Sequence, residues 1–521
     1  MTSLDRLSPA ALDAHRVHGL PDQVRPPAPL DRSAPPGIVH LGIGAFHRAH
    51  QAVVTERAGA AHNDSRWGIV GVTQRSASVR DQLAPQGGLY GVLELSQEPD
   101  GTPRTALDLI GSVRDVLFPG EDTAKVMEAI AATPTRIVSL TVTEKGYRRH
   151  PQGGPDFADP ALGHDLDLLA RELGGKRDAL ATPSRSAIGT LLRGLAHRWA
   201  TSGAPLTVVV CDNLLDNGPQ VAQLVHRIVD SSPAKSAEAF GSWLRESVAF
   251  PASMVDRIVP ATTDAHRATA EHLLGLRDAG LVVAEPFLQW VIEDRFAGPR
   301  PAWEDGGATL TDNVTPYEHT KLRVLNGTHS FLAYAGALRG HALIADAVAD
   351  PELNALAREL IDSDAIPSLE KVDEIDVEGY RESVLERFAN GAIGHTTVQI
   401  AMDGSQKLPI RFLGTAADRL AAGAVPHAIA RAVAAWMLYV YTTTQDSLEV
   451  GGTRVELDDP LATPLADAAR GPLDSLADRL LAMDAIFPAH LAEDPRWRDA
   501  VRAGLREVSS WSEAPAMGAL R

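Results

Sequence analysis

The sequence predicts an α/β protein with an N-terminal domain built on a parallel sheet and a mostly α-helical C-terminal domain. Up to about residue 300, short uninterrupted apolar runs alternate with helical patterns, which is typical of a parallel sheet buried on both faces. Beyond residue 300 these runs thin out and long alanine- and leucine-rich helical patterns replace them. The chain has 521 residues, more than one core usually holds, so two domains are expected.

The N-terminal part begins with a helical pattern over 9–20 and a proline-rich stretch over 25–36, which predicts an extended lead-in. A buried strand and a glycine turn follow in GIVHLGIGAF (37–46), then a helix over 47–60 and a second strand in WGIVGV (67–72). Further buried runs near 136–142, 205–212 and 281–287 are expected to add strands to the parallel sheet.

The C-terminal part contains the helical patterns of 329–349 and 425–441. The stretch AGPRPAWEDGGA (297–308) is rich in glycine and proline and is predicted to connect the two domains. We therefore expect one domain over 1–300, with residues 1–36 as its lead-in, and a second over 301–521.

Composition narrows the class of function. The net charge of −18, from 49 basic and 67 acidic residues, disfavours nucleic acid or an anionic membrane as the main partner. Cys211 is the only cysteine, so neither an intrachain disulfide nor a CxxC metal site is expected. The first residues lack a signal-peptide pattern and no apolar run reaches about 18 residues, which favours a cytoplasmic protein.

The segment GIGAFHRAHQA (42–52) follows the first buried strand and carries the first chemical signal. Glycines 42 and 44 permit a tight turn and close approach of the backbone to a pyrophosphate, which the following helix N-terminus would face. The third glycine of the GxGxxG pattern is replaced by His47, so an ordinary strand-to-helix turn is the alternative. We predict a dinucleotide site, with cofactor-binding residues at Gly42, Ile43, Gly44, Ala45, Phe46, Arg75, Thr143 and Asp212.

The second strand ends in Thr73, Gln74 and Arg75, without the carboxylate that usually binds the ribose of NAD. Arg75 either accommodates the 2′-phosphate of NADP or is simply solvated. The choice between NAD and NADP therefore stays open at this point.

Other polar residues follow later strands or lie in the helical part. Asp212 and Asn213 come directly after a strand, where open α/β sheets bind ligands, although an Asx turn explains them equally well. Lys145 is a candidate carboxylate ligand or a surface charge. Lys407, in QIAMDGSQKLPIR (399–411), is a candidate substrate contact from the helical domain.

The segment KLRVLNGTHS (321–330) is the least ordinary part of the sequence. On a helical wheel of 100° per residue, Leu322, Leu325 and Leu332 form an apolar stripe. His329 falls inside the stripe, Lys321 and Asn326 border it on either side, and Glu318 projects onto it, so four polar groups share the face that should pack. Unpaired buried polar groups cost about 1–3 kcal/mol each. The face is therefore either a structural Glu–Lys pair beside a core histidine, or the wall of a polar active site.

Seven ordered blocks together resemble one known family. They are IVHLGIGAFHRAHQA, SLTVTEKGY, CDNLLDNG, FPASMVDRIVP, EPFLQWVIEDRF, KLRVLNGTHSFLAY and QIAMDGSQKLP, spread over residues 38–411. The set is similar to the mannitol dehydrogenase family of polyol-specific long-chain dehydrogenases. The resemblance implies a Rossmann-like N-terminal domain, a mostly α-helical C-terminal domain and an active site in the cleft between them. It also implies NAD(P)-dependent hydride transfer without a metal.

The same resemblance implies roles for individual residues. Lys321 matches the lysine that acts as the catalytic acid/base, while Asn213 and Asn326 match the amides that hold the reacting oxygen. His329 matches the histidine of the same motif and Glu318 the acid that relays protons. In physical terms, a lysine can take a hydroxyl proton when desolvation lowers its pKa, and two amide donors can stabilise the developing alkoxide.

The substrate is less clear than the reaction type. TEKGY and a glutamine at 399 look more like fructuronate reductases, also called D-mannonate oxidoreductases, than like mannitol 2-dehydrogenases. We therefore expect Lys145, Gln399 and Lys407 to bind a sugar acid such as D-fructuronate or D-mannonate, with NAD as the provisional cofactor. Mannitol, arabinitol or mannitol 1-phosphate are the alternatives, as is a sensor that binds nucleotide or sugar without turnover. Monomer and homodimer both stay open.

Overall fold

We describe the fold from a computed structural model, in which residues 4–16, 19–98, 101–142, 144–150 and 153–511 are described. The chain forms two compact units, one holding the residues up to Thr315 and the other beginning at Pro316. No helix of the described residues combines the length and apolar character needed to cross a bilayer.

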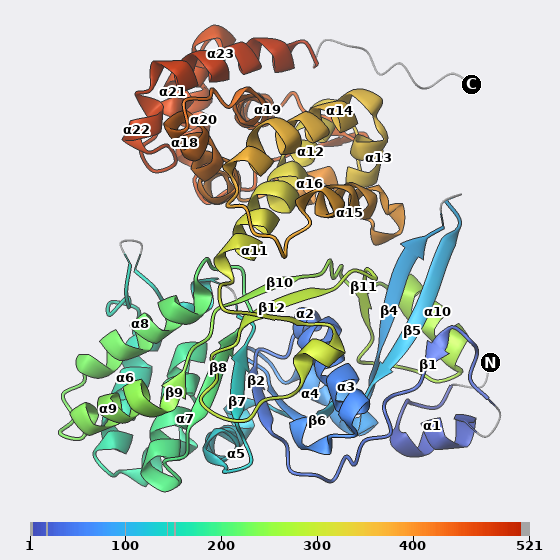
Figure 1. Cartoon of the computed structure of the whole chain (residues 1–521), viewed down its shortest axis with the longest axis vertical. Helices are drawn as coiled ribbons and strands as arrows, with labels where there is room; N and C mark the ends of the chain where they lie inside the picture. The colour runs from blue at the N-terminus through green and yellow to red at the C-terminus, as the bar shows by residue number, and fades with distance from the viewer. Residues whose placement is uncertain (1–3, 17–18, 99–100, 143, 151–152, 512–521) are drawn as a thin grey trace. The chain divides into compact units, whose positions relative to one another are not determined.

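The first unit is built around a six-stranded parallel sheet (Figure 1). Its strands are β2 (Ile38–Leu41), β3 (Ile69–Val72), β6 (Val113–Leu117), β7 (Ile137–Leu140), β8 (Leu206–Val210) and β9 (Val248–Ala249). They lie in the order β6-β3-β2-β7-β8-β9, and all neighbours are parallel. Numbered along the chain, this is the doubly wound order 3-2-1-4-5-6 of the Rossmann fold. The predicted parallel α/β sheet is confirmed.

Apolar side chains cover both faces of this sheet. Val39 and Leu41 of β2 pack into one cluster, whereas Ile38 of the same strand packs into another. This period-two alternation between two buried faces explains why the strands read as uninterrupted apolar runs. The helices of the unit are α1 (Pro9–Arg16), α2 (Ala45–Ala49), α3 (Gln51–His62), α4 (Ser78–Leu83), α5 (Pro119–Ala131), α6 (Pro160–Leu173), α7 (Ala187–Thr201), α8 (Asn217–Asp230), α9 (Ala237–Ser247) and α10 (Asp264–Leu274).

Two smaller sheets complete the unit. One has the order β1-β5-β4-β11, with β1 (Val24–Arg25), β4 (Tyr90–Gln97), β5 (Pro103–Ile110) and β11 (Val282–Ala284). The other has the order β10-β12-β13, with β10 (Ser253–Asp256), β12 (Gln289–Glu293) and β13 (Thr309–Thr311). The run near 281–287 is thus a strand, but it pairs with β4 instead of joining the main sheet. That part of the prediction was wrong, because apolar character does not specify a strand's partner.

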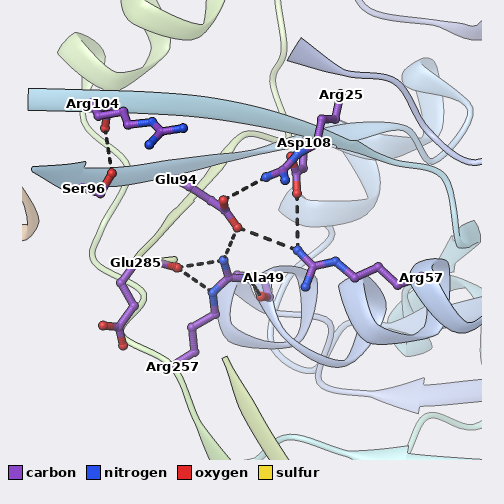
Figure 2. Close-up of polar contacts among 9 residues, drawn as sticks. All are labelled: Arg25, Ala49, Arg57, Glu94, Ser96, Arg104, Asp108, Arg257 and Glu285. Atoms are coloured by element: carbon purple, nitrogen blue, oxygen red, sulfur yellow. Dashed lines mark hydrogen bonds and ion pairs between the residues drawn. The ribbon is translucent and has the colours of Figure 1, made fainter. Parts of the chain in front are cut away.

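A buried arginine joins these parts of the first unit. Arg257 follows β10 and donates hydrogen bonds to the carbonyl oxygens of Ala49, at the end of α2, and of Glu285. Its guanidinium also pairs with Glu94 of β4 at 2.6 Å, and the Arg257 side chain has no exposed surface. Figure 2 shows the wider network, in which Arg25 and Arg57 bridge Glu94 to Asp108 of β5.

Two details of the first unit differ from the sequence prediction. The helix expected over 47–60 is two helices, α2 and α3, separated at His50, where the backbone leaves the helical region. The stretch 297–308 is not a loose connector, since Trp303 is buried and packs against Trp290 with ring centroids 4.6 Å apart.

The second unit is helical, as predicted, apart from the short pair β14 (Glu449–Val450) and β15 (Thr453–Arg454). At its centre, α12 (Gly327–Leu338) packs against α19 (His427–Thr444), which in turn packs against α23 (Pro495–Ser509). Gly504 of α23 lets that helix approach α19 closely, because a Cβ there would lie 3.0 Å from the Cα of Arg431. The remaining α-helices are α11 (Thr315–Thr320), α13 (Ile344–Ala349), α14 (Pro351–Glu359), α15 (Val377–Ala389), α16 (Thr397–Ala401), α17 (Gly404–Leu408), α18 (Gly414–Ala421), α20 (Ala462–Ala469), α21 (Leu476–Leu481) and α22 (Ala489–Ala492).

Among the described residues of the second unit, three segments are π-helices, a rare form with i→i+5 hydrogen bonds that is frequent at functional sites. They are Lys321–Asn326, Leu360–Ala365 and Pro409–Leu413. The first packs against each of the other two. It joins α11 to α12 and contains the start of the unusual segment KLRVLNGTHS.

Candidate active site

The turn after β2 has the geometry of a dinucleotide-binding loop. Gly42 has φ 101°, a conformation that side chains rarely adopt, and its N–H donates to Val72 O of β3 at 2.8 Å. A Cβ at Gly42 would collide with the carbonyl oxygen of Thr141, just beyond β7. The glycine is therefore required by the fold, and it brings the turn against the ends of β3 and β7.

This turn lies where the strand order reverses. β2 and β7 are first and fourth among the sheet's strands along the chain, and they are neighbours in space. Open α/β sheets bind ligands beyond the carboxyl ends of the strands at such a switch point. The predicted residues Gly42, Ile43, Gly44, Ala45 and Phe46 all lie in this turn or in the first residues of α2. The bare backbone and the switch point fit a pyrophosphate.

Two stacked histidines, His40 and His47, lie next to this turn, and their role was not predicted from the sequence. His40 of β2 and His47 of α2 have ring centroids 3.4 Å apart. His40 Nε2 lies 3.3 Å from the carbonyl oxygen of Gly42, and its Nδ1 lies 2.8 Å from Ser139 Oγ. A carbonyl can only accept, so Nε2 carries the proton and Nδ1 accepts from the Ser139 hydroxyl. Burial lowers the pKa of His40 to about 3, so the ring is neutral.

His47 stands where GxGxxG has its third glycine. That glycine normally permits close packing of helix on strand. Here the flat imidazole of His47 packs on His40 instead, and burial holds its pKa well below the usual value. The only sequence signal for this pair was the presence of two histidines seven residues apart around the glycine turn.

The end of β3 carries Thr73 and Arg75. Thr73 is buried, and its N–H donates to Leu117 O at 2.9 Å. Arg75 is exposed, and no hydrogen bond or ion pair ties it to another described residue. Its side chain is thus placed in solvent near the end of the second strand, as either of the predicted alternatives requires.

The end of β8 carries Asp212 and Asn213. The Asp212 carboxylate accepts the Tyr147 hydroxyl and the N–H of Leu214, the latter at 3.1 Å. Burial raises the pKa of Tyr147 well above its usual value, so the phenol remains a donor. Asp212 therefore shapes the loop as an Asx turn does, and the adjacent Asn213 is exposed. Predicted residue Thr143 lies outside the described residues, as does the side chain of Lys145.

In the second unit, the segment KLRVLNGTHS begins as a π-helix and not as the regular helix that the wheel assumed. At 100° per residue Lys321 and Asn326 would be about 140° apart. In the π-helix Lys321–Asn326, hydrogen bonds run from i+5 to i, as Gly327 N to Leu322 O shows. A π-helix holds more residues per turn than an α-helix, so Lys321 and Asn326 lie closer together around the helix axis than the wheel places them.

The burial predicted for this segment is confirmed. Glu318, Lys321 and His329 are 5%, 8% and 9% exposed, and Asn326 is half-buried. His329 stacks on Phe388 with ring centroids 4.7 Å apart and on His395 at 5.7 Å. Burial, with the nearby cationic groups, holds the pKa of His329 well below its usual value, so it is a neutral donor and acceptor.

Lys407 and Gln399 come from a second segment of the same unit. Lys407 Nζ donates to the carbonyl oxygen of Ile400 at 3.0 Å. Burial, reinforced by the charge of Arg411, lowers the pKa of Lys407 to about 8. Gln399 lies in the first turn of α16, where its N–H donates to Oγ1 of the capping residue Thr396, and its side chain is exposed. Across the described residues, no three histidine, cysteine or acidic side chains are grouped as metal ligands would be.

The comparisons with known proteins agree with this arrangement. The family profile described as Mannitol dehydrogenase Rossmann domain matches residues 36–305, and the Mannitol dehydrogenase C-terminal domain matches 313–509. The chain belongs to the mannitol dehydrogenase family. Members of this family are nicotinamide-dependent alcohol dehydrogenases, so the protein is an oxidoreductase that acts with a dinucleotide cofactor.

Relatives within the mannitol dehydrogenase family differ in substrate. The chain is 37% identical to D-mannonate oxidoreductase of Escherichia coli over 90% of its length and 93% of that protein. It is 36% identical to mannitol 2-dehydrogenase of Cereibacter sphaeroides, over 91% of this chain and 97% of that one. A solved ternary complex of Pseudomonas fluorescens mannitol 2-dehydrogenase with NAD and D-mannitol superimposes with a TM-score of 0.81, at 32% identity, covering 98% of this chain and 99% of that one.

Proposed function

We propose that the protein is a hexuronate reductase that converts D-fructuronate, NADH and a proton to D-mannonate and NAD⁺, and catalyses the reverse oxidation. The observation that carries the chemistry is the burial of Glu318, Lys321 and His329 around the π-helix that ends at half-buried Asn326. The substrate class is supported by Lys407, a half-buried lysine in the same unit, and by the similarity to D-mannonate oxidoreductase.

In this proposal, Lys321 is the acid/base. During oxidation its neutral amine takes the proton from the substrate hydroxyl, and during reduction its ammonium returns that proton to the carbonyl oxygen. Lys321 is only 8% exposed, and desolvation favours the neutral amine that proton abstraction requires. Glu318, one turn earlier, is the proposed route for the proton between Lys321 and solvent.

Amide donors complete the proposed site. Asn326 and Asn213 donate hydrogen bonds to the reacting oxygen and stabilise the negative charge that develops there. Neutral His329 bonds a neighbouring hydroxyl. Lys407, Gln399 and Lys145 are proposed to bind the carboxylate end, which a charge-assisted hydrogen bond from an ammonium favours.

The dinucleotide supplies the hydride acceptor or donor when it is bound. The backbone of Gly42, Ile43, Gly44, Ala45 and Phe46 would hold its pyrophosphate. Thr143 and Asp212 are also proposed to bind the dinucleotide. We propose NAD(H) because the superimposed Pseudomonas fluorescens enzyme holds NAD. The exposed Arg75 keeps NADP(H) as the alternative, since a guanidinium suits a 2′-phosphate.

A polyol dehydrogenase acting on mannitol or arabinitol is the second candidate. It is supported by the 36% identity to mannitol 2-dehydrogenase of Cereibacter sphaeroides, which is as close as the 37% identity to D-mannonate oxidoreductase. Initial rates with D-mannonate, D-mannitol, D-arabinitol and D-altronate, each with NAD and with NADP, test both proposals. A higher kcat/KM for D-mannonate supports the hexuronate reductase, and a higher value for D-mannitol or D-arabinitol supports the polyol dehydrogenase. Absence of turnover with every pair would refute both.

A further inference from the structure

The π-helix that carries Lys321 and Asn326 is held at its end by an arginine from a distant part of the second unit. Arg411 Nη1 donates to the main-chain carbonyl oxygen of Asn326 at 3.2 Å and to Ser330 Oγ at 2.7 Å. The contact uses the backbone of Asn326 and not its side-chain amide. It is made at the residue where the wide turn ends and the regular helix α12 begins.

The position of this junction determines the direction of the side chains that follow it. A return from i→i+5 to i→i+4 hydrogen bonding at any other residue would rotate the later side chains relative to Lys321. Asn326 would then turn further away from Lys321 around the helix axis, and His329 would shift with it. An outside donor on the Asn326 carbonyl stabilises one particular position of the junction.

Arg411 is well suited to this task. It lies in the π-helix Pro409–Leu413, which packs against the π-helix Lys321–Asn326. The first residue of its own segment is a proline, which has no backbone N–H. Both hydrogen bonds come from Nη1, whose two N–H groups have directions fixed by the planar guanidinium, whereas a lysine ammonium on its flexible stem has no such fixed direction. Arg411 also lies four residues after Lys407, and its charge lowers the pKa of Lys407, which Asp403 and Asp459 raise. Both cations lower the pKa of His329.

We propose that Arg411 is a positioning residue for the reaction: it fixes the end of the π-helix so that Lys321, Asn326 and His329 share one face, and it couples that face to the segment of Lys407. The inference rests on the proposed catalytic roles of Lys321 and Asn326. It assigns Arg411 no contact with substrate or cofactor.

The test compares Arg411→Gln and Arg411→Lys with Arg431→Gln in the full-length protein. Arg431 is a useful control because it is another largely buried arginine of the second unit, paired with Glu359 and Glu507. For Arg411→Gln we expect kcat to fall about 100-fold, the size expected when reacting groups are displaced by about 1 Å. The Kd for NADH should stay within twofold of the wild-type value. Arg411→Lys keeps the positive charge, but its kcat should regain less than a tenth of the rate that Arg411→Gln loses.

Hydrogen exchange measured by mass spectrometry over residues 318–330 provides a readout independent of turnover. Arg411→Gln should speed exchange in this segment by at least tenfold, whereas Arg431→Gln should leave it unchanged. The proposal would be overturned if Arg411→Gln kept both the wild-type exchange rate over residues 318–330 and a kcat within threefold of the wild-type value. An equal loss of kcat in Arg431→Gln would also overturn it, because the effect would then be general destabilisation. If the wild-type enzyme turns over none of the four substrates, the proposed function fails, and the exchange result alone decides the role of Arg411.

Discussion

Ser139 Oγ lies 2.8 Å from His40 Nδ1, so the fourth strand of the main sheet is hydrogen-bonded to the strand that leads into the Gly42 turn. The other nitrogen of the same ring lies 3.3 Å from the carbonyl oxygen of Gly42. The neutral imidazole of His40 thus connects β2 to its neighbour β7 and to the Gly42 turn.

Replacing His40 by phenylalanine keeps a ring against His47 and removes both hydrogen bonds. Each bond contributes about 0.5–1.5 kcal/mol, so we expect the Kd for NADH to rise about tenfold. The kcat at saturating cofactor should change less than threefold, since Lys321 is untouched. Calorimetric titration with NADH measures the effect. Ser139→Ala removes only one of the bonds and should give a smaller rise; an unchanged Kd in both variants would contradict this role.

Gly42→Ala should destabilise the protein and abolish dinucleotide binding. The φ of 101° costs a non-glycine residue about 1–3 kcal/mol, and the added Cβ would collide with Thr141 O. The matched control is Gly163→Ala in α6, where a Cβ meets nothing within 4 Å. That control should be neutral or stabilising by about 1 kcal/mol, because alanine is the better helix former. Chemical denaturation and NADH titration of both variants check the contrast.

Glu94→Gln should show how much the buried network contributes to the first unit. The change leaves the fully buried Arg257 guanidinium without its anion, which typically costs about 3–5 kcal/mol. The control is Glu98→Gln, directly after the end of β4. The ion pair between Glu98 and Arg104 is exposed and should contribute less than about 1 kcal/mol to stability. Urea unfolding followed by far-UV circular dichroism provides the comparison. Equal midpoints for the two variants would show that the network is not important for stability.

Much of the architecture could be predicted because it depends on local patterns. The strands at 38–41, 69–72, 137–140 and 206–210 were marked by apolar runs, and Gly42 by its place between strand and helix. The pairing of 282–284 could not be predicted, since a buried strand looks the same in any sheet. The hairpin of β4 and β5 was missed because Tyr90–Leu95 is buried on both sides and lacks clear alternation.

The candidate site was predictable in composition but not in geometry. The wheel marked Lys321, Asn326 and His329, yet it assumed a regular helix, whereas the structure has a π-helix there. Local propensity does not specify that wide turn; contacts such as Arg411 with Asn326, 85 residues apart, accompany it. The role of His40 likewise depends on Ser139, which is 99 residues away.

Lys321→Ala should remove most turnover while cofactor binding survives. General acid–base catalysis contributes about 10²–10⁴-fold, so kcat should fall within that range. The Kd for NADH should remain near the wild-type value, because the Gly42 turn is unchanged. The exposed Lys125→Ala in α5 controls for loss of a lysine charge. Partial recovery of the Lys321→Ala rate by added methylamine would identify the missing group as an amine, and a near-wild-type kcat would refute the assignment.

The pKa of about 8 for Lys407 gives a pH test of the substrate class. If its ammonium binds a substrate carboxylate, kcat/KM for D-mannonate should fall relative to that for D-mannitol as the pH rises through about 8. The ratio of the two values cancels every titration that both substrates share, including that of the proposed base. In Lys407→Met the ratio should lose this pH dependence and favour D-mannitol. A wild-type ratio that is flat between pH 7 and about 9 would argue against a Lys407–carboxylate contact.

The lowered pKa of Lys407 also predicts how the free energy of unfolding changes with pH. Its pKa is about 8 in the folded protein and 10.5 in its ordinary state, so between these values the unfolded chain binds more protons. The contribution of Lys407 to the free energy of unfolding therefore rises with pH across this window. Lys407→Met should be more stable than wild type at pH 7, and the difference should shrink as the pH rises above 8. A difference that stays constant with pH would mean that Lys407 keeps an ordinary pKa in the fold.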